Sequence, residues 1–167
     1  MSRGGRKDRK PQVWTFESSV QSAADVDVFD TFATPIPKFG SSTRPTVLEV
    51  LAIDSAFYGV FNPAVGVHFH AQLSTVFLSK TDSGDPRVLY ASARHVKEDA
   101  GYSYQHNFPD DYTDQRGNGT LVATDNLYLK FETLATGYAT NKVYIKILYR
   151  LIDVPLSEWV GIVQSQQ

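Results

Sequence analysis

The chain has 167 residues, a net charge of −2 and no cysteine. Its length fits one domain, and its hydrophobic fraction of 42% is typical of a globular chain rather than a disordered one. The lack of cysteine excludes a disulfide framework, thiol catalysis and cysteine-ligated zinc. No apolar run approaches the ~18 residues that a membrane-spanning helix needs, so we expect no membrane insertion.

The charge is unevenly distributed. The first ten residues contain five basic side chains and one acid, which gives +4, whereas the other 157 residues carry 11 basic and 17 acidic side chains. We therefore expect a flexible basic arm over residues 1–11 and one folded domain over residues 12–167. The alternative is a solvated terminus without a partner. The predicted nucleic-acid-binding residues, which would contact phosphates, are Arg3, Arg6, Lys7, Arg9 and Lys10.

Next along the chain come short segments that alternate between apolar and polar residues or are rich in β-branched residues, which indicates strands. Prolines and glycines separate most of them. Within one segment the apolar phase changes near Thr75, which predicts a bulge or bend. The predicted strands are Val13–Ser18, Val26–Ala33, Pro45–Asp54, Val67–Leu78, Arg87–Ala93, Asn126–Thr133 and Lys142–Val154.

The last two of these strands have the clearest pattern. Odd positions from Val143 to Leu151 are all apolar, whereas even positions from Tyr144 to Ile152 include the charged residues. In the preceding strand Leu127, Leu129 and Phe131 share one face. A helix would scatter these sets around its circumference, so the pattern predicts strands.

A short helix is predicted at the C-terminus. Ser157 would cap it, Glu158 would lie in its first turn, and Trp159, Ile162 and Val163 would share a face. With strands elsewhere, the predicted fold class is an all-β antiparallel sandwich or barrel.

No residue pattern supports catalysis, so we expect neither an enzyme nor a cofactor. His68 and His70 have a spacing found in some metal sites, but no third ligand is apparent and a polar strand face is an ordinary place for histidine. The residues Asp110, Asp111 and Asp114 are weak candidates for a hard cation such as calcium, with a solvated loop as the alternative.

An aromatic-rich loop follows residue 100. Aromatic residues are enriched at protein interfaces, so this loop is a candidate subunit contact, and the alternative is a loop folded back on its own domain. The candidate contact residues are Tyr102, Tyr104, Phe108 and Tyr112. Asn118 begins a glycosylation sequon, for which nothing in the sequence indicates use.

Three features together resemble coat proteins of small viruses with circular single-stranded DNA genomes, and also satellite-virus coat proteins. They are the basic terminus from Arg3 to Lys10, the stretch RPTVLEVL at residues 44–51, and the block from Tyr128 to Val163 with VYIKILYRLIDV and SEWVGIV. The arm is shorter and less basic than the long arginine-rich termini of many family members.

The resemblance implies an eight-stranded jelly roll with a basic N-terminal arm and a short C-terminal helical turn. It implies a capsid protein that self-assembles into an icosahedral T=1 shell of about sixty copies and packages single-stranded DNA. The protein would be found in the virion, after assembly inside the host cell, with the nucleus as a candidate compartment.

Two other functions fit an all-β chain. A lectin-type sandwich would use the aromatic and acidic residues of 102–114 to bind carbohydrate, but it would have no need of a basic arm. A barrel that binds single strands would need basic and aromatic residues across its face, whereas this body is net negative.

Overall fold

The computed structural model of the chain describes residues 10–21, 26–37, 43–58, 67–80, 84–96, 110–134 and 141–167. Within these ranges the chain forms nine strands and one helix. They are β1 (Gln12–Glu17), β2 (Val28–Ala33), β3 (Thr46–Tyr58), β4 (Val67–Ser74), β5 (Val88–Val96), β6 (Asp110–Asp111), β7 (Thr120–Val122), β8 (Asn126–Leu134), β9 (Lys142–Asp153) and α1 (Leu156–Ser165).

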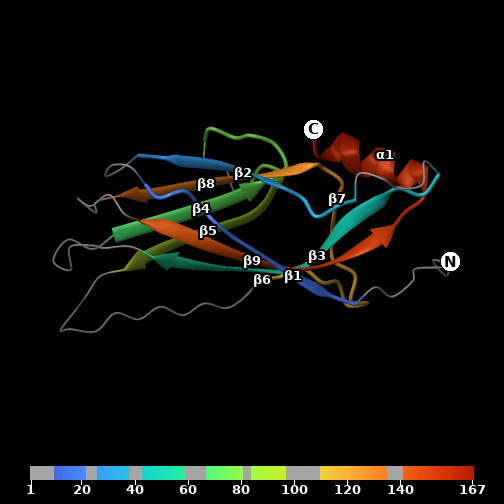
Figure 1. The fold of residues 1–167 in the computed structure, drawn as a ribbon, viewed down its shortest axis with the longest axis horizontal. Helices are drawn as coiled ribbons and strands as arrows, with labels where there is room; N and C mark the ends of the chain where they lie inside the picture. Colours follow the sequence, from blue (N-terminus) through green and yellow to red (C-terminus); the bar gives the residue numbers. More distant parts are fainter. Residues whose placement is uncertain are drawn as a thin grey trace.

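The strands form two antiparallel sheets that pack as a sandwich (Figure 1). The β9 sheet has the order β1-β9-β3-β6, with β7 also pairing with β3, and the β8 sheet has the order β2-β8-β4-β5. Because β6 and β7 pair with different stretches of β3, they act as two halves of one edge strand. Successive strands then alternate between the sheets, except β4 and β5, and the arrangement is an eight-stranded jelly roll. The predicted fold class is confirmed.

The core lies between the sheets and is built from alternate residues of their strands. Leu127, Leu129 and Phe131 of β8 are at most 1% exposed, as their spacing predicts. Odd positions of β9 from Val143 to Tyr149 belong to the same core. Full burial of each such aliphatic or aromatic side chain contributes about 1.5–3 kcal/mol, so these inner faces hold the sheets together.

The helix α1 covers one end of the outer face of the β9 sheet. Val47, Ile152 and Val154 are buried there, and Trp159 and Ile162 of the helix pack against them. The alternation of β9 places Ile152 on the charged face of the strand, yet only 3% of it is exposed because the helix covers that end.

The predicted cap of this helix is wrong. Ser157 lies inside the first turn, because α1 begins at Leu156 with Pro155 at the capping position and no side-chain hydrogen bond there. The ring of Pro155 holds φ at −59°, which suits a helix start. Glu158 is in the first turn, as predicted, where its charge interacts favourably with the helix dipole.

Two strands end at residues other than those predicted, because hydrogen bonding with neighbouring strands determines where each strand ends. β3 continues beyond its predicted end to Tyr58, because this stretch also pairs with β9. β4 ends at Ser74 rather than Leu78, and its register with β5 shifts between Leu73 and Ser74, next to the predicted bend at Thr75. β6 and β7, with 2 and 3 residues, are too short to show alternation in the sequence.

Gln166, which follows α1, ties the C-terminus to both sheets. Its Oε1 accepts a hydrogen bond from the Ala123 N–H at 3.0 Å, and its Nε2 donates to the Leu121 carbonyl at 2.6 Å. Its own carbonyl accepts a hydrogen bond from Thr75 Oγ1 at 3.2 Å. Gln166 is 7% exposed, so these bonds are shielded from water.

Candidate functional site

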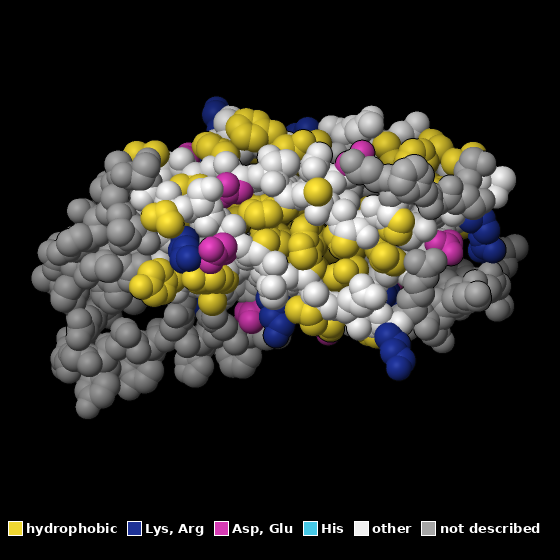
Figure 2. Space-filling model, in the orientation of Figure 1, with side chains coloured by type: hydrophobic (Ala, Val, Ile, Leu, Met, Phe, Trp, Pro, Cys, Tyr) yellow, Lys and Arg dark blue, Asp and Glu magenta, His cyan; other side chains and the backbone are white. Residues whose placement is uncertain are grey.

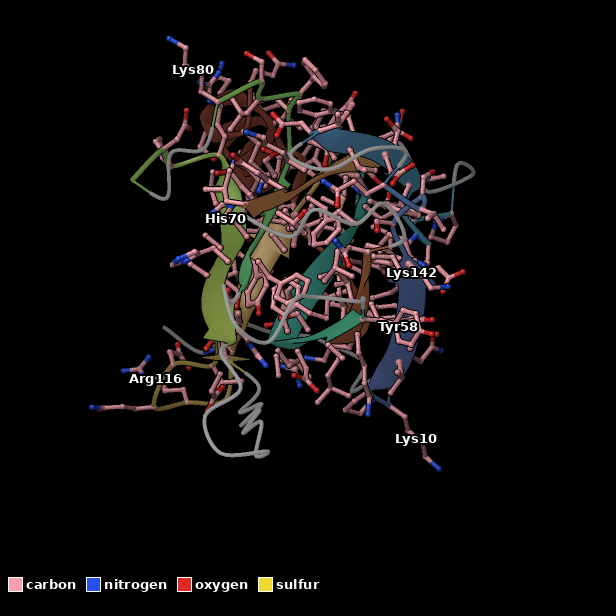
Figure 3. The ribbon with its side chains drawn as sticks, turned by 90° about the vertical axis from the view of Figure 1, so that its left-hand side faces the viewer. Lys10, Tyr58, His70, Lys80, Arg116 and Lys142 are labelled. Atoms are coloured by element: carbon pink, nitrogen blue, oxygen red, sulfur yellow. The ribbon has the colours of Figure 1, made fainter. Side chains whose placement is uncertain are left out.

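The predicted basic arm, residues 1–11, is followed in the sequence by β1, an edge strand of the β9 sheet. Lys10 is exposed and projects away from the sandwich (Figure 3). Two residues later Gln12 pairs with Tyr149 of β9. The other predicted nucleic-acid-binding residues lie outside the described residues: Arg3, Arg6, Lys7 and Arg9. Lys10, the described basic residue of the predicted arm, therefore lies next to a sheet edge.

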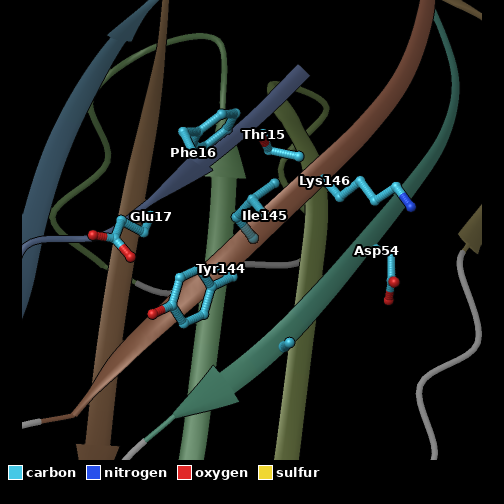
Figure 4. A pocket seen from close by; sticks show the side chains of 8 residues that line it. Thr15, Phe16, Glu17, Asp54, Tyr144, Ile145 and Lys146 are labelled. Atoms are coloured by element: carbon cyan, nitrogen blue, oxygen red, sulfur yellow. The ribbon is translucent and has the colours of Figure 1, made fainter. Parts of the chain in front are cut away.

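A shallow hollow of about 450 Å³ lies on the outer face of the β9 sheet, over β1, β9 and β3 (Figure 4). In the register, Lys146 of β9 lies between Thr15 of β1 and Asp54 of β3. The lining residues are Thr15, Phe16, Glu17, Asp54, Ala56, Tyr144, Ile145 and Lys146. The hollow therefore combines both signs of charge with a tyrosine.

Lys142 forms an ion pair with Glu17, one of the residues that line this hollow. Its Nζ lies 2.9 Å from Glu17 Oε2 and 4.9 Å from the centre of the Tyr144 ring. The hydrogen bond from Lys142 lowers the pKa of Glu17, and the bonds to Tyr144 and Glu17 raise the pKa of Lys142. Both groups therefore stay ionised at neutral pH.

A buried carboxylate lies within the apolar PTVLEVL stretch. Glu49 is 0% exposed and accepts hydrogen bonds from Arg150 Nε and, at 3.0 Å, from the Gly119 N–H. Arg150 Nη2 also donates to the Gly117 carbonyl at 3.0 Å. A Cβ at Gly119 would lie 2.0 Å from the Val50 carbonyl oxygen, so only glycine fits there. The sequence signal for this contact is a single acid inside an apolar strand.

Two of the three acidic candidates, Asp111 and Asp114, accept hydrogen bonds from the loop that follows β6. Asp111 Oδ1 accepts hydrogen bonds from the Thr113 N–H and Oγ1 at 2.8 and 2.7 Å, which lowers its pKa. Asp114 accepts bonds from the side chain and N–H of Asn118, and its pKa is lowered too. Asp110 pairs with Ile53 in the β6–β3 ladder. These carboxylates order the loop, and the sequon nitrogen of Asn118 is engaged within it.

Tyr112 packs against the main core of its own domain. Its N–H donates to the Leu51 carbonyl at 2.9 Å, and burial raises the pKa of its hydroxyl. The Tyr112 ring is thus partly buried within its own domain. The other predicted contact residues lie outside the described residues: Tyr102, Tyr104 and Phe108.

Hydrophobic side chains gather in the middle of the face shown in Figure 2, with charged side chains around them. This face holds the edge strands β1 and β2, one from each sheet. Phe16 of β1 lies 4.7 Å from Trp14 and 4.2 Å from Phe32 of β2, measured between ring centres. All three rings are only partly buried, so this edge keeps apolar surface in contact with solvent.

A second aromatic group lies on the outer face of the β8 sheet. Phe29 and Phe77 are 42% and 57% exposed, and their ring centres are 5.2 Å apart. Tyr128 lies 6.4 Å from Phe77, and Lys130 Nζ lies 6.0 Å from the Phe29 ring centre. Aromatic side chains are enriched at protein interfaces, so this group is a candidate contact site.

The remaining candidate features are metal ligands and membrane spans. No three His, Asp, Glu or Cys side chains whose placement is described come together to hold a metal ion. His68 is exposed and His70 half-buried on the outer face of β4. No helix among the described residues is long and apolar enough to cross a membrane.

No protein-family model matches the chain, and no curated protein matches it. Solved viral capsid structures do match. VP1 of New Jersey polyomavirus has a TM-score of 0.55 at 8% identity, covering 87% of this chain and 100% of the other. VP1 of Trichodysplasia spinulosa-associated polyomavirus, in complex with GM1 oligosaccharide, has a TM-score of 0.52 at 12% identity, covering 89% and 96%.

A variant of Washington University polyomavirus VP1, solved as an unassembled pentamer, has a TM-score of 0.50 at 9% identity, covering 89% and 96%. Identities this low establish a shared fold rather than a shared family. The chain therefore has the jelly-roll fold found in these viral capsid proteins.

Proposed function

We propose that the chain is the coat protein of a small virus and that its copies self-assemble into a closed icosahedral shell. The observation that carries this proposal is the complete jelly roll, which resembles polyomavirus VP1 over 87–89% of the chain. Fold alone does not determine function, so the surface of the chain must supply the rest of the argument.

That surface supports assembly. The apolar edge at Trp14, Phe16 and Phe32 and the exposed pair Phe29 and Phe77 offer area that a neighbouring subunit would bury. Because the chain has no cysteine, burial and hydrogen bonds would hold such a shell together without disulfides. Further proposed contacts come from the aromatic loop, at Tyr102, Tyr104 and Phe108.

We infer that the arm contacts the packaged genome, which we propose to be single-stranded DNA. Flexible arginines and lysines bind phosphates regardless of sequence. In a T=1 shell, about sixty arms of +4 would bring about 240 positive charges to the interior. The protein would then be located in the virion, with assembly inside the host cell and the nucleus as the proposed compartment.

The size of the purified full-length protein tests the assembly. We expect closed particles of one size by light scattering and negative-stain microscopy. They should separate into subunits when the apolar contacts are weakened by urea. A monomer or small oligomer at every salt concentration would overturn the proposal.

Carbohydrate binding is the second candidate function, and one observation favours it: a VP1 with the same fold is solved with a GM1 oligosaccharide. It would act on the outside of a shell and does not exclude assembly. A glycan array probed with intact particles and with isolated subunits separates the two functions. Glycan binding by a chain that never assembles would favour a lectin over a coat protein.

A further inference from the structure

The hollow on the outer face of the β9 sheet contains an aspartate and a lysine that do not pair with each other. Lys146 of β9 lies directly opposite Asp54 of β3. Even so, no ion pair joins them in the part of the chain that the structure describes. Figure 4 shows both side chains on one side of the hollow, with Tyr144 and Glu17 on the other. Two groups of opposite charge therefore line the hollow without bonding to each other.

One oxygen of Asp54 lacks a hydrogen bond. Its Oδ1 is buried and has no partner, and a buried acceptor without a donor costs about 1–3 kcal/mol. The carboxyl group of an aspartate turns readily, because the energy profile of its last torsion is broad. A donor that enters the hollow can therefore bond to this carboxylate and remove that cost.

Tyr144 provides a flat apolar surface beside these polar groups. Its ring is 40% exposed. Lys142 Nζ lies 4.9 Å from the ring centre and 2.9 Å from Glu17 Oε2, which restrains both neighbours of the ring. On the adjacent strand, Ala56 lies directly opposite Tyr144, and its methyl group is too small to cover the ring. The ring therefore keeps an open surface towards the hollow.

The charges around the hollow favour an uncharged ligand. Glu17 and Asp54 are acidic whereas Lys142 and Lys146 are basic, so −2 and +2 sum to zero. A multiply charged anion would lie close to two carboxylates and a metal cation close to two ammonium groups, and like charges repel. A wholly apolar ligand would remove water from these charges without replacing its hydrogen bonds. Hydroxyl groups suit them, because each hydroxyl both donates and accepts.

A sugar ring has both of the required surfaces. A pyranose carries C–H groups on its faces, which can lie against the negatively polarised face of an aromatic ring, and hydroxyl groups around its rim. The hollow of about 450 Å³ falls within the range of about 300–1,000 Å³ that is typical of small-molecule sites. Because it is shallow, it would hold one end of a saccharide and leave the rest in solvent.

We propose that this hollow binds an uncharged sugar unit, with the sugar ring against Tyr144 and its hydroxyl groups bonded to Asp54 and Lys146. The hydroxyls donate to the Asp54 carboxylate and accept from Lys146 Nζ. Thr15, which lies opposite Lys146 on β1, adds a further hydroxyl at the rim. The inference rests on carbohydrate binding, the second proposed function, to which it assigns a site and a class of ligand.

Saturation-transfer NMR on the full-length protein tests this proposal. The probes are the methyl glycosides of glucose, galactose, mannose and N-acetylglucosamine, which are uncharged, and the acidic sugar N-acetylneuraminic acid. We expect at least one uncharged glycoside to bind, and we expect the acidic sugar not to displace it, because its carboxylate would be repelled by Asp54. The proposal is overturned if no uncharged glycoside binds or if the acidic sugar binds in its place.

Three variants locate the bound sugar. Asp54→Ala removes the acceptor and should weaken binding by about 10-fold or more, the factor expected for a lost hydrogen bond to a charged group. Tyr144→Ala removes the stacking surface and Ala56→Leu fills the space beside it, so both should also weaken binding. The matched control is Tyr58→Ala, at a tyrosine of β3 that is 59% exposed and is not one of the lining residues, and it should bind as the unmodified chain does.

Unfolding midpoints identify any variant that is destabilised, and the other variants still test the site. Binding that persists in the folded variants would overturn this site but leave carbohydrate binding at another position. A chain that binds no sugar would overturn both the site and the second proposed function. Particle formation is measured separately, so neither result bears on assembly of the coat.

Discussion

Arg150 on β9 pairs with a Glu49 side chain on β3 that has no exposed surface. The two residues are directly opposed in the β3–β9 ladder, and both also hydrogen-bond the turn that ends at Gly119. One ion pair therefore joins two central strands to the turn before β7. Removing one partner leaves a buried charge without compensation, which costs more than the pair contributes when intact.

We expect Arg150→Ala to lower the free energy of unfolding by about 3 kcal/mol, because the buried Glu49 carboxylate would lose its cationic partner. Urea unfolding of the subunit measures this change. Lys142→Ala is the matched control, since it breaks the solvent-exposed pair with Glu17 and should leave stability nearly unchanged. Equal stability of the two variants would contradict the structural role of Glu49.

Replacing Gly119 and Gly161 by alanine should change the stability of the chain in opposite directions. Gly119→Ala places a methyl group 2.0 Å from the Val50 carbonyl oxygen, so the turn must move away from β3. Gly161 lies in α1 with nothing within 4 Å of the added carbon, so Gly161→Ala should stabilise the chain by about 0.5–1 kcal/mol. Thermal unfolding should show a lower midpoint for the first variant and a higher one for the second. A tolerated Gly119→Ala would show that this turn is not packed against β3.

Acidification should weaken the loop between β4 and β5. The hydrogen bonds from the side chain and N–H of Arg87 lower the pKa of Asp85 from 3.8 to about 2. A lowered carboxyl pKa means that the stabilisation is complete above pH 3.8 and is lost as the pH falls through about 2. An NMR titration of the Asp85 carboxyl carbon should have its midpoint near pH 2. Arg87→Gln should move that midpoint back towards 3.8, and an unmoved midpoint would exclude Arg87 as the cause.

Removing the positive charge of the arm should reduce nucleic-acid binding without changing the fold. We expect glutamine at all five basic positions of residues 1–10 to reduce the nucleic acid that co-purifies with the protein, with no change in the circular dichroism spectrum. For binding to single-stranded DNA, the slope of log K against log salt concentration should become shallower by about 0.7 for each phosphate that the arm no longer neutralises. Lys80→Gln, at an exposed lysine of the body, is the control. Unchanged nucleic-acid content would show that the arm is not the binding element.

Phe29 and Phe77 should matter for assembly rather than for folding. Replacing both with serine removes an exposed aromatic pair, so we expect the subunit to keep its unfolding midpoint while the yield of closed particles falls. Analytical ultracentrifugation measures the amounts of free subunit and of closed particles. Thr31→Ser, an exposed change on the same strand, is the control. Normal particle yield from the double variant would place subunit contacts elsewhere.

Sequence reasoning found the elements whose signal is local. β8 and β9, with 9 and 12 residues, alternate long enough to be recognised, and their inner faces are those predicted. β6 and β7 exist only because β3 lies beside them, so the sequence carries no signal for either strand. Glu49 was visible as an acid in an apolar run, but its partner Arg150 lies 101 residues away.

The amide group of Gln166 has a consequence for how subunits can join. By accepting from Ala123 and donating to Leu121, it occupies the place of a peptide group from an adjoining strand. An exposed strand edge invites uncontrolled sheet extension between chains. At β7 the subunit's own C-terminus already saturates those backbone groups. Addition of a strand from another chain at β7 is therefore blocked, which disfavours extension of the β9 sheet into a fibre at that part of its edge.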